Sequence, residues 1–149
     1  MRRFIVLLAV FMILAGTAGA ETRWAMCNGF VNVRSSPDKR SAVSGYLDSG
    51  DPFETDGKEK DGFIRVSGFG ENGDGWAFKG YVVTEQPEEV NARYVCIAKN
   101  RVACRKYIGG PRIGWLYNGA NVTVYRMTSE WSVTNRGYIR SEWLEPDPE

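Results

Sequence analysis

One absence restricts the chemistry available to this chain: its 149 residues include no histidine. Neither a Ser-His-Asp nor a Cys-His nucleophile can therefore be built, and a His-ligated zinc site is impossible. Three cysteines are too few for a structural zinc held by four thiolates. The 18 acidic residues could supply a pair of catalytic carboxylates, but their spacing singles out no two of them. The composition favours a binding protein with no metal, no cofactor and no catalytic activity.

Two arginines occupy equivalent places, because each follows a short segment of alternating apolar residues. Arg34 follows Val31-Asn32-Val33, and Arg105 follows Val102-Ala103-Cys104. A guanidinium in that place can secure a loop carbonyl or a carboxylate of its own chain, which is a structural role. It can also hold a carboxylate or phosphate of a ligand. Arg34 and Arg105 are therefore candidate ligand-binding residues.

Four aromatic residues stand where they could contact a ligand instead of building a core. Tyr46 and Trp115 each lie between a glycine and a leucine, and strand alternation turns them away from that leucine. Tyr81 and Trp143 each follow a Gly-aromatic strand after a short polar turn, where they could border a groove. Outward aromatic rings near loops suit stacking on a glycan or peptide. Most other large aromatic residues are expected in the core.

The first 20 residues differ from the rest. Arg2 and Arg3 precede an unbroken apolar run over residues 4–15, and Gly-Thr-Ala-Gly-Ala follows at 16–20. These are the three parts of a secretory signal peptide. The run is shorter than the roughly 18 residues that a spanning helix needs, so we expect cleavage after Ala20 and no stable membrane anchor. The alternative is an uncleaved anchor. Either way the protein is expected outside the cytoplasm, whether secreted, at the cell surface or in the periplasm.

Charge restricts the partners further. Without Arg2 and Arg3, residues 21–149 carry 17 basic and 18 acidic residues, a net charge of −1. Binding to nucleic acid relies on neutralising phosphates, so we expect no nucleic-acid partner.

Beyond the leader, short runs rich in Val, Ile and aromatic residues alternate with turn-forming Gly, Asn, Asp and Pro clusters, which is typical of a small β-barrel or sandwich. The predicted strands are Phe30–Arg34, Val43–Leu47, Pro52–Thr55, Phe63–Val66, Gly75–Phe78, Tyr81–Val83, Tyr94–Ile97, Val102–Arg105, Ile113–Tyr117, Val122–Tyr125, Trp131–Thr134, Tyr138–Arg140 and Trp143–Leu144.

An acidic stretch with one proline, residues 84–92, interrupts this pattern, and we interpret it as a linker. It divides the chain into two β units, residues 21–83 and 93–145. The last residues, 146–149, are acidic and proline-rich, and we predict that they form a disordered tail.

The two units repeat the same motifs in the same order. The segment 31–34 corresponds to 102–105, and 45–50 corresponds to 114–119. The segment from Gly75 to Val82 corresponds in the same way to Gly137–Leu144.

The first unit resembles the bacterial SH3-like (SH3b) domain family through Val31–Pro37, Val43–Asp51 and Gly75–Val82. The second unit resembles the family more weakly, because it lacks the Ser-x-Pro that follows Arg34. The resemblance implies an all-β chain of two tandem small SH3-like barrels. It also implies a non-enzymatic module, and some members of the family bind peptidoglycan or its peptide cross-bridges. The alternatives are an extracytoplasmic protein–protein interaction module or an inhibitor of another exported protein, and a minimal hydrolase.

Two cysteines lie eight positions apart. If residues 97–103 form a hairpin centred on Asn100, Cys96 and Cys104 stand opposite each other, close enough for a disulfide. Cys27 would then be buried, or free for an intermolecular bond. The alternative pairing, Cys27 with Cys96, would join the first strands of the two units.

Overall fold

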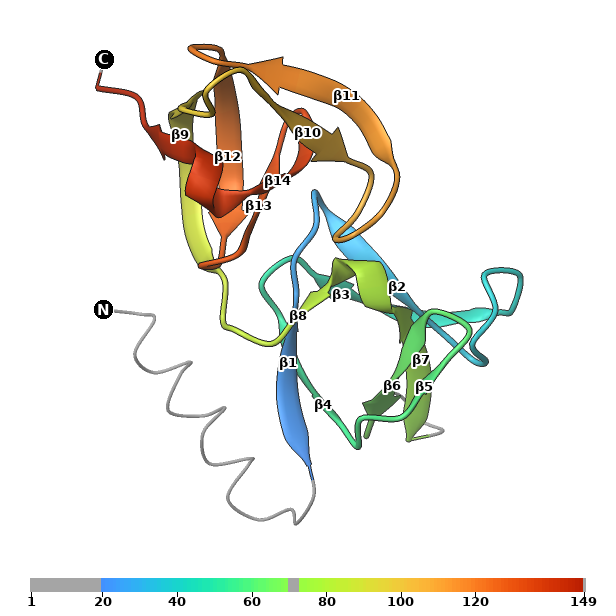
Figure 1. Ribbon diagram of the computed structural model, residues 1–149. Coiled ribbons are helices and arrows are strands. Elements are labelled where there is room, and N and C mark those ends of the chain that lie inside the picture. The colour runs from blue at the N-terminus through green and yellow to red at the C-terminus, as the bar shows by residue number, and fades with distance from the viewer. Residues whose placement is uncertain (1–19, 70–72, 149) are drawn as a thin grey trace, which may run out of the picture.

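The computed structural model describes residues 20–69 and 73–148, and it shows an all-β chain built on two sheets (Figure 1). The expected signal peptide lies outside the described residues, apart from Ala20. In the described part of the chain, no helix has both the length and the apolar character needed to cross a membrane.

The N-terminal sheet has eight strands, and every strand pair in it is antiparallel. Seven strands are hydrogen-bonded in the order β3-β2-β7-β6-β4-β1-β8, and β5 pairs with β6. A 3-10 turn, η1 (Lys79–Tyr81), precedes the last strand. The strands are β1 (Glu21–Ala25), β2 (Phe30–Arg34), β3 (Val43–Asp48), β4 (Pro52–Thr55), β5 (Glu59–Lys60), β6 (Phe63–Ser67), β7 (Asp74–Phe78) and β8 (Val82–Val83).

The C-terminal sheet has seven strands in the order β11-β10-β14-β13-β12-β9-β15. Its 3-10 turn, η2 (Ser141–Trp143), again precedes the last strand. The strands are β9 (Glu88–Cys96), β10 (Arg101–Arg105), β11 (Arg112–Tyr117), β12 (Asn121–Met127), β13 (Trp131–Thr134), β14 (Gly137–Arg140) and β15 (Leu144–Pro146).

The strand orders of the two sheets correspond position by position, so the repeat seen in the sequence is also a repeat of topology. In each copy the strand that carries the candidate arginine, β2 or β10, lies between a hairpin partner and the strand that leads into the 3-10 turn. The predicted all-β fold with two tandem β units is therefore confirmed. Among the described residues the first and last strands of each path are not paired, so each sheet bends around its own core without closing.

Each sheet encloses its own apolar cluster, because alternate side chains point inward. Val33, Ile64 and Val66 are buried in the N-terminal sheet. Leu116, Val124 and Ile139 occupy the equivalent interior of the C-terminal sheet.

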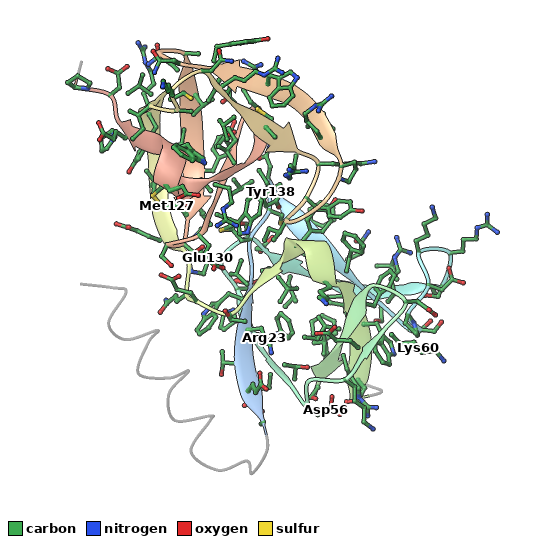
Figure 2. The ribbon with its side chains drawn as sticks, viewed as in Figure 1. Arg23, Asp56, Lys60, Met127, Glu130 and Tyr138 are labelled. Carbon is green, nitrogen blue, oxygen red and sulfur yellow. The ribbon has the colours of Figure 1, made fainter. Side chains whose placement is uncertain are left out.

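A third buried cluster joins the two sheets, and it contains Met26, Val83, Val133 and Tyr138. The hydroxyl of Tyr138 donates a 2.6 Å hydrogen bond to the carbonyl of Met26. Figure 2 labels Tyr138 at this junction, between the upper and lower sheets. The sheets therefore pack directly on each other.

The predicted linker over 84–92 is wrong in its second half, because β9 begins at Glu88, which pairs with Met127 of β12. Most side chains at the start of β9 are exposed, so the strand lacks the apolar alternation by which strands are recognised. β1 was not predicted either. Its residues contribute a strand between β4 and β8.

The predicted disordered tail is also wrong at its start. Pro146 pairs with Tyr94 as the last residue of β15. Asp147 donates its backbone N–H to the carbonyl of Arg93, and its carboxylate lies 3.1 Å from Nε of the same arginine. These contacts with β9 attach the segment to the sheet despite its composition.

The predicted hairpin between Cys96 and Cys104 does not form. Cys96 ends β9 and pairs with Leu144, whereas Cys104 lies in β10 and pairs with Gly114. Three other strands separate β9 from β10 in the sheet order. All three cysteines of the chain are described, and each is a buried free thiol, so the structure shows no disulfide between Cys96 and Cys104.

Candidate functional site

A groove runs along the junction of the two sheets. It consists of two cavities, of about 540 and about 430 Å³, which share Phe30, Tyr81 and Lys106 in their walls. Phe30 begins β2 and Tyr81 ends η1, both in the N-terminal half, and Lys106 follows the last residue of β10 in the C-terminal sheet. We call this combined space the inter-sheet groove.

Local structure explains how these side chains reach the groove. Phe30 is the first residue of β2, and Arg34 is the last, so one strand supplies both. Tyr81 ends η1, the turn that carries the chain from β7 into β8. Arg136 stands just before Gly137, which adopts a φ of 114° that non-glycine residues rarely take.

Aromatic rings form one wall of the groove. Tyr107, from the C-terminal half, contacts Phe78 edge-on with ring centroids 4.7 Å apart, and its centroid lies 6.3 Å from that of Tyr81. Tyr81 also stacks on Tyr138, with centroids 6.2 Å apart. Edge-to-face and stacked pairs of this kind each contribute about 0.5–1.5 kcal/mol beyond their buried area.

The ring of Tyr107 is held between two glycines. A Cβ built on Gly80 or on Gly110 would lie 2.6 Å from the ring of Tyr107, so neither position has room for a side chain. The backbone N–H of Ile108 donates to the carbonyl of Gly80 across the junction. Backbone and ring contacts therefore fix this wall of the groove.

The groove is cationic. Arg34, Lys39, Lys106 and Arg136 line its two cavities, and none of the described lining residues is acidic. Arg34 donates to the carbonyl of Ser41 at 2.9 Å, and Arg136 donates to the carbonyl of Trp115 at 3.1 Å. Each of these hydrogen bonds occupies only part of a guanidinium, which has five N–H donors. The groove can therefore attract an anionic ligand and hydrogen-bond to it.

Four titratable side chains that line the groove, Cys27, Cys104, Tyr81 and Tyr138, have raised pKa values and stay protonated at neutral pH. Burial raises the pKa of Cys27 to about 11. Burial also raises the pKa values of Tyr81 and Tyr138, and the neighbouring Cys27 adds to both shifts. A neutral thiol is a poor nucleophile and metal ligand. The described residues contain no cluster of acidic, Cys or His side chains that could hold a metal ion.

The structure brings two of the six candidate residues, Arg34 and Tyr81, into the inter-sheet groove. Tyr46 lies beside it, because its ring contacts that of Phe30 with centroids 5.4 Å apart, and both side chains are about 60% exposed. Tyr46 faces solvent, as strand alternation predicts.

The other three candidates lie elsewhere. Arg105 and Trp143 line a separate cavity on the C-terminal sheet. Trp115 is half-buried, with the guanidinium carbons of Arg101 and Arg112 lying 3.8 and 4.4 Å from its ring centroid.

Several groove residues were missed by sequence reasoning, namely Phe30, Lys106, Tyr107 and Arg136. Phe30 was assigned to a strand without a role. The other three line the site only because the C-terminal sheet packs against the N-terminal one. The available signal was the departure of residues 106–108 from the Ser-x-Pro pattern, since Lys106 and Tyr107 are the residues that fill the junction.

Comparison with known proteins gives one family match. Residues 29–83 match the family model described as the bacterial SH3 domain. No curated protein gives a significant match to the chain.

Two solved structures show a distant likeness, both from Trichomonas vaginalis. NlpC1 is 16% identical with a TM-score of 0.36, and the alignment covers 86% of this chain and 46% of that one. NlpC2 is 16% identical with a TM-score of 0.34, and the alignment covers 86% of this chain and 48% of that one. The chain therefore spans about half the length of these proteins, and similarity this low carries no argument about function.

Proposed function

We propose that this chain, whose residues 29–83 match the bacterial SH3 domain model, is a non-catalytic module that binds peptides of the bacterial cell wall. The ligand lies in the inter-sheet groove and contacts both sheets. The module acts outside the cytoplasm, because residues 1–20 have the composition of a secretory leader.

The observation that carries this proposal is the charge of the groove. One cavity is lined by Arg34, Lys39 and Lys106, and the other by Lys106 and Arg136. None of the described residues that line them is acidic, so their positive charge is not neutralised. Peptides of the wall carry free carboxylates, which a guanidinium binds by two parallel hydrogen bonds. A cationic groove in a chain of nearly zero net charge selects for such a ligand.

The aromatic wall supports a peptide ligand as well. Tyr81 and Tyr107 line the cavity that also contains Arg34. Apolar side chains of a peptide can pack on these rings while its carboxylates meet the cations. Because the ring of Tyr107 is held between Gly80 and Gly110, little of its side-chain entropy is lost on binding.

The same groove gives no support for catalysis. The thiol of Cys27 is buried, and burial raises its pKa to about 11, so it stays protonated at neutral pH. Its tyrosine hydroxyls are weak acids, and Tyr138 already donates its proton to the carbonyl of Met26. These groups can bind and orient a ligand, but they supply no general base at neutral pH.

The proposal is tested by titrating the protein with a wall tetrapeptide in two forms, one with free carboxylates and one fully amidated, using calorimetry. We expect binding of the free acid and at least about tenfold weaker binding of the amide, since hydrogen bonds to charged groups are the stronger ones. Lys106→Ala should weaken binding of the free acid by about tenfold. The matched control is Lys58→Ala, an exposed lysine in the loop between β4 and β5 that does not line the groove.

Equal binding of the two peptide forms would contradict the proposal, and so would equal effects of Lys106→Ala and Lys58→Ala. If neither form binds, an exported protein becomes the better candidate ligand for the groove, and chemical cross-linking in the native envelope would identify it.

A further inference from the structure

The small net charge of the chain conceals a strong separation of charge. Residues 21–92 contain eight basic and thirteen acidic residues, a net charge of −5. Residues 93–145 contain nine basic and three acidic residues, a net charge of +6. In Figure 2, blue nitrogen atoms gather along β11 at the top of the molecule. The C-terminal sheet therefore has an electrostatic character of its own.

Part of this charge lines a concave site. A cavity of about 520 Å³ lies beside the start of β10, and its cations are Lys99, Arg101, Arg105 and Arg140. Trp143 completes the site, and it is 37% exposed. None of the described residues that line this cavity is acidic. We call it the C-terminal groove.

The C-terminal groove is the repeat equivalent of the cavity that contains Arg34. Arg34 and Arg105 end the equivalent strands β2 and β10, and Tyr81 and Trp143 end the equivalent turns η1 and η2. Both pairs line their respective cavities. The same architecture thus forms a groove twice, once at the junction of the two sheets and once among residues of the C-terminal half alone.

Two aromatic positions of the first groove have become arginine in the second. Phe30 begins β2 and Arg101 begins β10, while Phe78 ends β7 and Arg140 ends β14. All four residues line their respective cavities. At these two positions the C-terminal groove therefore has guanidiniums where the first cavity has aromatic rings, which changes the chemistry of the ligand that fits.

Aromatic rings hold these guanidiniums. The guanidinium carbon of Arg101 lies 3.8 Å from the ring centroid of Trp115, and that of Arg140 lies 5.3 Å from the ring centroid of Trp131. Stacking uses the face of a guanidinium and leaves its N–H edge for hydrogen bonds. The only ion pair that an arginine of the groove makes within the described chain is a 3.7 Å contact between Arg140 and Glu142, and both side chains are exposed. Such exposed pairs contribute little.

We propose that the C-terminal groove is a second binding site, specific for an anionic polysaccharide whose sugar units carry carboxylate or phosphate groups. The arginines bind the anionic groups, and the exposed ring of Trp143 stacks on a sugar face. A groove with an aromatic wall fits a linear polymer better than it fits the flat surface of a bilayer. This site goes beyond the peptide-binding function proposed above and uses different residues.

The experiment titrates the full chain, purified after expression, with polygalacturonate and separately with a phosphodiester-linked mannan, which distinguishes carboxylate from phosphate. Vesicles of anionic phospholipid and duplex DNA are the comparison polyanions. We expect binding of at least one polysaccharide, and at least about tenfold weaker binding after Arg101→Gln with Arg140→Gln, because two charge-assisted contacts are lost. The control with the same change of charge is Lys58→Gln with Lys60→Gln, on the N-terminal sheet, which should leave binding unchanged.

Trp143→Ala tests the aromatic contact separately, because it leaves the net charge of the protein unchanged. We expect it to weaken polysaccharide binding by about tenfold. The proposal is overturned if Trp143→Ala binds normally, if the lysine control loses as much affinity as the arginine variant, or if DNA or vesicles bind as tightly as both sugars. Circular dichroism verifies that each variant is folded. Lys106→Ala should leave polysaccharide binding intact, so failure of the peptide site and failure of this one are distinguishable.

Discussion

Tyr138 and Met26 lie 112 positions apart in the sequence, yet the hydroxyl of the tyrosine donates a 2.6 Å hydrogen bond to the carbonyl of the methionine. Both residues are buried, in the cluster that joins the two sheets. The bond satisfies a carbonyl that would otherwise be cut off from water. It holds together the two walls of the inter-sheet groove, so the groove is a property of the whole chain.

We predict that Tyr138→Phe lowers the free energy of unfolding by about 1–3 kcal/mol, because it leaves the buried carbonyl of Met26 without its donor. Urea denaturation followed by tryptophan fluorescence measures the change. Tyr117→Phe removes a hydroxyl from a side chain that is 53% exposed, and it should have almost no effect. Equal stability of the two variants would mean that the hydrogen bond does not hold the sheets together.

Gly80→Ala should destabilise the protein by about 1–3 kcal/mol through overpacking. The added Cβ would meet the ring of Phe78 at 2.5 Å and that of Tyr107 at 2.6 Å, and both rings belong to the packed wall of the groove. Gly114→Ala is the matched control, since a Cβ there has no described atom within 4 Å beyond its chain neighbours. Thermal unfolding of the two variants checks the prediction. A Gly80→Ala protein as stable as the control would show that the wall is loosely packed.

Alkaline pH should destabilise the fold partly through Cys27. Burial raises the pKa of this thiol from 9.0 to about 11, so the folded state keeps a proton that the unfolded state releases. The resulting stabilisation is complete below about pH 9 and is lost as the pH rises towards 11. Between about pH 8.5 and pH 10.5, the free energy of unfolding should therefore fall less for Cys27→Ala than for the unaltered protein. Urea unfolding at a series of pH values would reveal parallel curves for the two proteins if the thiol has no such role.

Much of the fold could be predicted from the sequence. The turn signals placed most strands, including Phe30–Arg34 and Trp131–Thr134, with bounds that match β2 and β13. The internal repeat was visible as well, and it reappears as one strand order used twice. These features are local or periodic, so a single sequence contains them.

The rest depended on contacts between distant segments. The start of β9 is polar, and only its pairing with β12 makes it a strand. Cys96 and Cys104 are close in sequence, but Cys96 lies in β9, near one end of the strand order of the C-terminal sheet, and Cys104 lies in β10, near the other end. The candidate residues Arg34 and Tyr81 were found by their motif, whereas Lys106 and Arg136 became part of the groove through the packing of one sheet on the other. A net charge of −1 likewise gave no hint of the charge separation between the halves.

The measurement that tests the central claim most directly is retention of the purified protein on insoluble peptidoglycan, washed at low and at high salt. The account predicts that the unaltered protein stays bound after the high-salt wash, because the groove combines hydrogen bonds and ring packing with charge. Lys106→Ala should be released by that wash, and Lys58→Ala should be retained. Release of the unaltered protein, or retention of all three proteins alike, would contradict the claim that the inter-sheet groove binds the wall.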